Sequence, residues 1–226
     1  MSLPRRIAAP LLAACLVCAL PARAEWGGTL ALLSDGQERG VSYSDGRPQA
    51  VLGLAWDGSQ GRYAGLQLTH SRFWGDRRSA WLQAYAGQVV ELTPGLDAEA
   101  GLRVHRFPSL GHYDFAEAYV GLLAERWQLR LHHAPDYYGL AQRTWYAELN
   151  GRWPLAAGLA ATGHVGVAAV QGRGRAREDL RLGLSRTLGE SAELQLAWVA
   201  VGRGGPSSWT DPPRRRQWLA SVSLGF

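Results

Sequence analysis

The feature that most limits the fold is a pattern that repeats from about residue 26 to the last residue, Phe226. About ten residues alternate between apolar and polar, and a turn follows. In residues 177–188 one face carries Leu180, Leu182 and Leu184, and the other carries Asp179, Arg181, Gly183 and Ser185. Successive strand side chains point to opposite faces, and repeated alternation of this kind is typical of membrane barrels. We therefore expect an all-β fold, a closed antiparallel up-and-down transmembrane β-barrel of about 12 strands.

The positions of the expected strands follow from where the alternation is interrupted. The strands are 26–43, 48–57, 62–72, 80–91, 97–107, 114–124, 127–137, 143–153, 158–169, 177–188, 192–202 and 215–226. Tight connections such as 58–61 alternate with longer ones such as 203–214, as periplasmic turns alternate with external loops in outer-membrane barrels. An even number of strands places both chain ends in the periplasm. Because no composition break divides the chain, we expect a single domain, residues 25–226.

The last expected strand has the most regular alternation. Trp218, Ala220, Val222, Leu224 and Phe226 alternate with Leu219, Ser221, Ser223 and Gly225. A terminal aromatic residue with apolar residues at every second position resembles the C-terminal assembly signal of outer-membrane barrels. The assembly machinery reads that signal by strand pairing. We expect Trp218, Val222, Leu224 and Phe226 to form this signal and face lipid, and the strand to pair with the one that begins near Trp26.

The N-terminus resembles a secretory signal peptide. Arg5 and Arg6 precede the apolar residues 7–20, and Ala22-Arg23-Ala24 offers a cleavage site. We expect residues 1–24 to be removed and the mature chain to reside in the cell outer membrane. Leu12-Ala13-Ala14-Cys15 is an alternative lipoprotein box, but cleavage there would leave a very short signal. No other segment reaches the roughly 20 apolar residues of a spanning helix.

Composition excludes several classes of function once the signal is removed. Both cysteines, Cys15 and Cys18, lie in the signal, so disulfides, thiol catalysis and cysteine–metal sites are excluded from the mature chain. All 24 basic residues are arginine, and three of them lie in the signal, which leaves 21 against 19 acidic residues. Despite a pI of about 9.6, this near balance and export argue against a nucleic-acid partner.

Alternation alone does not say which face is inside, because a soluble barrel or sandwich buries its apolar face. Trp145 and Trp153 share the apolar face of one strand, eight residues apart. In a tilted strand this spacing corresponds to about 20 Å of height, near that of an apolar band between two aromatic girdles. The alternative is that tryptophan, a good strand former, fills a core.

The inward face carries the candidate site. We expect Ser34, Asp35, Arg39 and Asp136 to cluster near the external mouth. Further inward candidates are Glu99, Arg103, Glu117, Arg130, Glu148, Arg152, Arg181 and Glu193. Such charges form either a constriction that selects solutes or an ion-pair network that braces the wall. Both signs occur, so the charges can also pair across the lumen and close it. A barrel of twelve strands is intermediate in size between barrels of about 8 strands, which side chains fill, and porins of about 16–18 strands, which leave an open channel.

Several short motifs occur in the order found in a known family. They are Ser34-Asp35-Gly36-Gln37-Glu38-Arg39-Gly40-Val41-Ser42, Asp45-Gly46-Arg47-Pro48, Gly61-Arg62-Tyr63-Ala64-Gly65, Ala84-Tyr85-Ala86-Gly87, Glu117-Ala118-Tyr119-Val120-Gly121 and Ala134-Pro135-Asp136-Tyr137. Together they resemble the Gcw_chp family of bacterial outer-membrane proteins, many of them described as porins of the TorF type. Gly36 departs from the family pattern, which has an aromatic residue there. The resemblance implies fold and location; the family has no established mechanism, and a fold does not fix a function.

Three functions remain open. The first is a porin or channel that passes small hydrophilic solutes, and the second is a closed structural or lipid-binding barrel. The third, an outer-membrane lipid-modifying enzyme, is disfavoured because no hydrolase motif surrounds any serine or histidine. We therefore expect no enzyme activity, catalytic residue, metal or cofactor. The expected partners are small solutes, the barrel assembly machinery, and outer-membrane lipid and lipopolysaccharide, whose phosphates suit arginine. The loop arginines for this contact are Arg77, Arg78, Arg173, Arg175 and Arg214 to Arg216.

Overall fold

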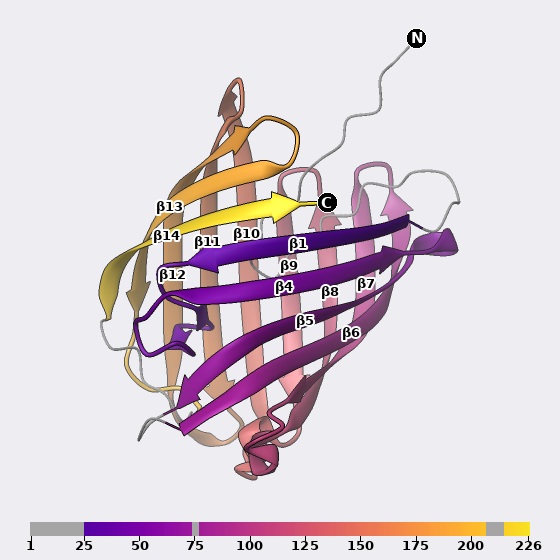
Figure 1. Cartoon of the computed structure of the whole chain (residues 1–226). Helices are drawn as coiled ribbons and strands as arrows, with labels where there is room; N and C mark the ends of the chain where they lie inside the picture. Colours follow the sequence, from indigo (N-terminus) through magenta and orange to yellow (C-terminus); the bar gives the residue numbers. More distant parts are fainter. Residues whose placement is uncertain (1–24, 74–76, 207–214) are drawn as a thin grey trace.

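A computed structural model describes residues 25–73, 77–206 and 215–226; the expected signal peptide, residues 1–24, lies outside the described residues. Within the described part of the chain, twelve strands form one closed antiparallel barrel in which sequence neighbours pair and β1 closes against β14 (Figure 1). The expected fold class is confirmed. No helix in the described residues is long and apolar enough to cross a membrane.

The barrel strands agree with the expected segments to within a few residues, apart from the first. They are β1 (Glu25–Leu33), β4 (Gln49–Asp57), β5 (Arg62–Phe73), β6 (Arg77–Thr93), β7 (Leu96–Arg106), β8 (Phe115–Ala124), β9 (Trp127–Ala134), β10 (Thr144–Ala156), β11 (Leu159–Val170), β12 (Arg173–Leu188), β13 (Ala192–Val201) and β14 (Arg216–Gly225). Short 3-10 turns occur at Ser59–Gly61, Gly111–Tyr113 and Tyr137–Gly139.

The expected first strand, 26–43, is wrong beyond Leu33. After that residue the chain leaves the barrel wall, and β2 (Gln37–Glu38) and β3 (Val41–Ser42) form a separate two-stranded hairpin. The two residues of its turn, Arg39 and Gly40, have φ angles of 52° and 73°. Positive φ at both central positions is the geometry of a type I′ hairpin turn. We call residues 34–48 the plug segment, because its central residues are buried inside the barrel.

The polar and apolar faces of the strands point as a membrane barrel requires. On β7, Leu102 is 64% exposed, whereas its neighbour Arg103 is 9% exposed. The same contrast recurs around the barrel, so the apolar face is outside and the charged face is inside. Trp26, Trp127, Trp145, Trp153 and Trp218 all lie exposed on the outer face. The alternative that tryptophan fills a core is therefore wrong for these five residues, although it holds for Trp81, which is 3% exposed.

The closing seam confirms the expected pairing of the first and last strands. β1 and β14 pair from Thr29↔Gly225 to Leu33↔Ser221. One step further, the Phe226 N–H donates to the Gly28 carbonyl at 3.0 Å, and the Gly28 N–H donates to the Phe226 carbonyl at 2.7 Å. The ring of Phe226 lies where a Cβ on residue 28 would be, so the glycine makes room for the terminal aromatic residue.

Deleting Phe226 is expected to weaken closure of the barrel. The deletion removes both hydrogen bonds with Gly28, and at about 0.5–1.5 kcal/mol each we expect a loss of about 1–3 kcal/mol. The measurement is the folded fraction after refolding into detergent, read from heat-modifiable migration on a gel. Phe226→Leu keeps the backbone pair and serves as the control. Refolding of the deletion variant to the wild-type extent would contradict this role.

Candidate functional site

The candidate site is the lumen, and the plug segment is its central component. Within the plug, Val41, Ser42 and Ser44 are at most 2% exposed. The Tyr43 carbonyl accepts a 2.7 Å hydrogen bond from the Arg72 N–H of β5, and the Tyr43 ring stacks on Trp81 of β6 with centroids 4.1 Å apart. The segment thus enters the barrel from β1 and contacts the wall formed by β5 and β6.

Asp35 fixes the start of the plug segment. Its carboxylate is 3% exposed and accepts hydrogen bonds from Gln37 Nε2 (2.8 Å), Ser42 Oγ (2.6 Å) and Ser44 Oγ (2.7 Å). A fourth donor is Gln217 Nε2 of β14, at 2.8 Å. Three of these bonds hold the hairpin together, and the fourth ties it to the barrel wall.

Arg39, at the tip of the hairpin, reaches the opposite wall. Its Nη2 donates to Glu117 Oε1 of β8 at 2.7 Å, and the two side chains are 6% and 0% exposed. The guanidinium also lies over the ring of Tyr146 of β10, 4.7 Å from its centroid. Burial lowers the pKa of Arg39, but the attraction of Glu117 outweighs it and holds the pKa well above its usual value. The tip is therefore held by a charged pair sealed from water.

Glu117 is the centre of a larger buried network. Besides Arg39, its Oε1 lies 3.8 Å from Arg103 Nη1, 3.5 Å from His105 Nε2 and 3.4 Å from His132 Nδ1. His132 in turn lies 3.1 Å from Glu148 through Nε2. One carboxylate thus lies beside two arginines and two histidines, and this network joins the plug to β7, β8, β9 and β10.

A second ion pair joins Glu99 of β7 to Arg130 of β9 across the intervening strand β8. Arg130 Nη2 donates to Glu99 Oε2 at 2.9 Å, and Arg130 Nε donates to Glu99 Oε1. Gly121 of β8 lies opposite both residues in the strand register, and a side chain there would collide with the pair. Glu99 also accepts from Tyr63 Oη at 3.0 Å. The glycine is what allows two residues on non-adjacent strands to meet.

Further inward charges pair on the other side of the barrel. Arg152 Nη2 donates to Glu193 Oε2 at 2.7 Å, and its Nη1 donates to Ser185 Oγ at 2.8 Å. His164 Nε2 lies 2.7 Å from Asp179 Oδ1, and its Nδ1 lies 2.7 Å from Asn150 Oδ1. Most candidate charges of the inner face therefore lie in pairs, with partners on the wall or on the plug segment.

Two predicted members of the mouth cluster lie elsewhere. Ser34 is exposed and extends the β1–β14 ladder, because its N–H donates to the Ala220 carbonyl at 2.8 Å. Asp136 is exposed in the β9–β10 loop, where its Oδ1 accepts from the Ala141 N–H at 2.7 Å. The expected cluster of Ser34, Asp35, Arg39 and Asp136 is therefore wrong. Only Asp35 and Arg39 lie inside, and they bind opposite walls.

Sequence reasoning missed an aromatic layer at the loop end of the lumen. Its buried members are Tyr43, Trp81, Phe107, Tyr113, Phe115, Tyr137 and Tyr138. Phe115 packs against Tyr137 and Tyr138, with centroids 5.0 and 4.8 Å apart. Burial raises the pKa of Tyr138 well above its usual value, so its hydroxyl stays neutral. The signal for this layer in the sequence is that Trp81 and Phe115 occupy inward-facing positions of their strands.

Three inward histidines were likewise not predicted as part of the site. His105, His132 and His164 all point inward among carboxylates. The structure provides no group of three or more His, Cys, Asp or Glu arranged for a metal ion within its described residues. The chemistry that this arrangement offers is ion pairing and hydrogen bonding between the wall and the plug.

Comparison with solved structures shows the same fold in outer-membrane channels. The chain is similar to the KdgM porin, with a TM-score of 0.56 and 10% identity over 88% of this chain and 99% of that one. It is similar to the NanC porin, with a TM-score of 0.56 and 12% identity over 88% and 99%. An outer membrane channel from Pseudomonas putida F1 gives a TM-score of 0.53 and 13% identity over 92% and 96%. At these identities the likeness establishes the fold.

Sequence comparison is more specific. No curated protein matches the chain. A family described as "Bacterial protein of unknown function (Gcw_chp)" matches residues 22–219, in agreement with the motifs that begin at Ser34. This match spans nearly the whole barrel, and the chain therefore belongs to the Gcw_chp family.

Proposed function

We propose that the protein is an outer-membrane channel for small hydrophilic solutes whose resting state is closed by the plug segment. The observation that carries this proposal is how the plug is attached. It is one hairpin held by the polar contacts of Asp35, by the Arg39–Glu117 pair and by the packing of Val41 and Tyr43 in the aromatic layer. Contacts of this kind can break and re-form without disturbing the barrel ladder. The fold likeness to porins and channels supports the same function.

The outer surface supports the proposed location. Leucine, valine and tryptophan side chains dominate the outward positions, which suits a lipid environment. The signal peptide expected in residues 1–24 and the terminal strand would direct export and assembly. Among the loop arginines, Arg77, Arg78, Arg175, Arg215 and Arg216 are exposed. We propose them as contacts for lipopolysaccharide phosphates; Arg214 lies outside the described residues.

A charge placed on the outer face is expected to destabilise the barrel in a depth-dependent way. Leu182, in the middle of β12, is 52% exposed, and Leu188, at the end of the same strand, is 45% exposed. Leu182→Arg should cost about 2–4 kcal/mol, and Leu188→Arg about 0–1 kcal/mol, because the interface solvates the charge. Urea unfolding in lipid vesicles measures both. Equal losses would show that this face does not cross a bilayer.

A closed structural or lipid-binding barrel is the second candidate. It is favoured by the pairing of Glu99 with Arg130 and of Arg152 with Glu193, which brace the wall on either side of the lumen. The enzyme alternative gains no support, because no histidine is hydrogen-bonded to a serine among the residues that the structure describes.

Liposome swelling separates the two candidates. Vesicles that contain the protein are diluted into an isotonic pentose solution, and swelling follows solute entry. The channel proposal expects slow swelling with the wild type and faster swelling with Arg39→Ala, which frees the tip of the plug. No swelling with either protein, at equal folded content, would favour the closed barrel.

A further inference from the structure

The guanidinium of Arg39 lies between two buried side chains of the barrel wall, Glu117 of β8 and Tyr146 of β10, which we call the cation cage. Glu117 Oε1 accepts from Arg39 Nη2 at 2.7 Å, and the centroid of the Tyr146 ring lies 4.7 Å from Arg39 Cζ. The Tyr146 hydroxyl lies 3.1 Å from His164 Nε2 of β11, which holds the ring in place. A carboxylate beside an aromatic face suits a guanidinium group.

The cage belongs to the wall, whereas its occupant belongs to the plug segment. Glu117 and Tyr146 lie on strands that pair only with other barrel strands. Arg39 lies in the turn of the β2–β3 hairpin and reaches the cage through its side chain alone. The Arg39 side chain can therefore leave while the cage keeps its geometry.

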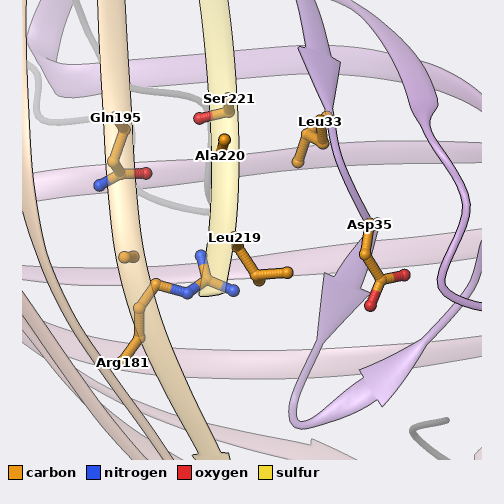
Figure 2. A pocket seen from close by; sticks show the side chains of 8 residues that line it. Leu33, Asp35, Arg181, Gln195, Leu219, Ala220 and Ser221 are labelled. Carbon is orange, nitrogen blue, oxygen red and sulfur yellow. The ribbon is translucent and has the colours of Figure 1, made fainter. Parts of the chain in front are cut away.

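The base of the plug segment differs from its tip. Figure 2 shows Asp35 on the stretch of chain that follows Leu33, with the Arg181 side chain extending toward it from β12. The pocket beside Asp35 has a volume of about 10 Å³, which is room for one water molecule. A solute has no space there, so the place where a solute can replace part of the plug is the cage at the tip.

The charges around the cage require a second cation. Glu38 Oε1 lies 3.8 Å from Arg39 Nε and 3.6 Å from Arg103 Nη1, and Glu117 Oε1 lies 3.8 Å from Arg103 Nη1. Two carboxylates thus share two arginines. When the Arg39 side chain leaves, Arg103 alone faces both carboxylates, and a buried negative charge without a partner is unfavourable. A cation that enters the cage restores the balance.

Glu117 also has an unused acceptor. Its Oε2 is buried without a hydrogen-bond partner among the described residues, because Arg39 donates to Oε1. A free guanidinium is not constrained by the hairpin and can donate to both oxygens of the carboxylate. A solute can thus gain a contact that Arg39 lacks, which helps it to compete with a tethered side chain at millimolar effective concentration.

We propose that the cation cage binds the guanidinium group of a small solute, and that Arg39 fills the cage when no solute is bound. The planar guanidinium suits the ring face and the two carboxylate oxygens better than an ammonium group does. The inference names a solute class for the lumen. Only its consequence for transport rests on the proposed channel function.

The test is binding of N-ethylguanidinium to the purified Arg39→Ala protein in a non-ionic detergent, measured by ligand-observed NMR titration. This probe has the atoms that the substitution removes. At about pH 8 the flanking histidines, His105 and His132, are ordinarily uncharged. N-ethylurea has the same shape without the charge and should bind about tenfold or more weakly, since a charged hydrogen bond is lost.

Arg47→Ala is the matched control. It removes an exposed arginine of the same plug segment and leaves Arg39 in the cage, so N-ethylguanidinium should bind it about tenfold or more weakly than Arg39→Ala. Added to Arg39→Ala, either Glu117→Gln or Tyr146→Leu should also weaken binding, by about tenfold and about threefold or more. Heat-modifiable migration verifies that each protein is folded.

Two results would overturn the site. One is equal binding of N-ethylguanidinium and N-ethylurea to Arg39→Ala, and the other is equal binding of N-ethylguanidinium to Arg39→Ala and Arg47→Ala. If guanidinium binds as expected but the protein never conducts, the channel proposal fails and the cage stands. Conduction without guanidinium binding overturns the cage and leaves the channel proposal standing.

Discussion

Glu117→Ala is expected to destabilise the folded barrel by about 3–5 kcal/mol, the cost of removing one partner from a buried ion pair. The carboxylate is 2% exposed and lies within 4 Å of Arg39, Arg103, His105 and His132. Without it, Glu38 is the one carboxylate left beside both buried guanidinium groups, at 3.8 Å from Arg39 Nε and 3.6 Å from Arg103 Nη1. Urea unfolding followed by tryptophan fluorescence gives the free energy of unfolding.

Glu190→Ala provides the control for Glu117→Ala. Glu190 lies exposed in the turn between β12 and β13, so its loss should change stability by about 0.5 kcal/mol or less. Glu117→Gln keeps the side-chain volume and should give an intermediate loss. If Glu117→Ala and Glu190→Ala unfold at the same urea concentration, the network around Glu117 does not stabilise the barrel.

Arg39→Ala is expected to release the plug segment while leaving the barrel wall intact. Its charged hydrogen bond to Glu117 contributes about 1.5–3 kcal/mol, so the displaced state should become about 10–100 times more populated. Val41 is 0% exposed, and a cysteine there reports displacement. A water-soluble maleimide should react with Val41→Cys slowly in the wild-type background and about 10–100 times faster with Arg39→Ala.

The labelling experiment has two internal controls. Both native cysteines lie in residues 1–24, so protein without Val41→Cys gives the background. Arg47→Ala removes an exposed arginine of the same plug segment and should leave the labelling rate unchanged. Equal rates for the Arg39→Ala and Arg47→Ala proteins would mean that the Arg39–Glu117 pair does not hold the plug.

The barrel was predictable because apolar and polar residues alternate along its strands. Alternation in segments such as 177–188 places leucine outside and charge inside, and the structure confirms it for Leu182 and Arg181. The plug was not predictable by the same rule. Residues 34–43 continue a pattern compatible with a strand, and the Arg39-Gly40 turn lacks the Asn-Gly or Asp-Gly pair that usually marks a type I′ hairpin.

The charged positions of the lumen were predictable, but their partners were not. Arg103 and Glu117 lie opposite each other on neighbouring strands, so exact register decides whether they meet. Glu99 and Arg130 meet only because Gly121 lies between them. A sequence without known register does not specify such contacts.

The most direct test of the closed-channel account is single-channel recording in planar bilayers, comparing the wild type with a variant in which residues 36–47 are replaced by a short glycine–serine linker. The linker removes the Arg39 tip and the Tyr43 contact but retains Asp35 and every barrel strand. If the plug closes the channel, we expect rare or small conductance steps for the wild type and large, steady steps for the variant. A silent variant, or a wild type that conducts as well as the variant, would contradict it.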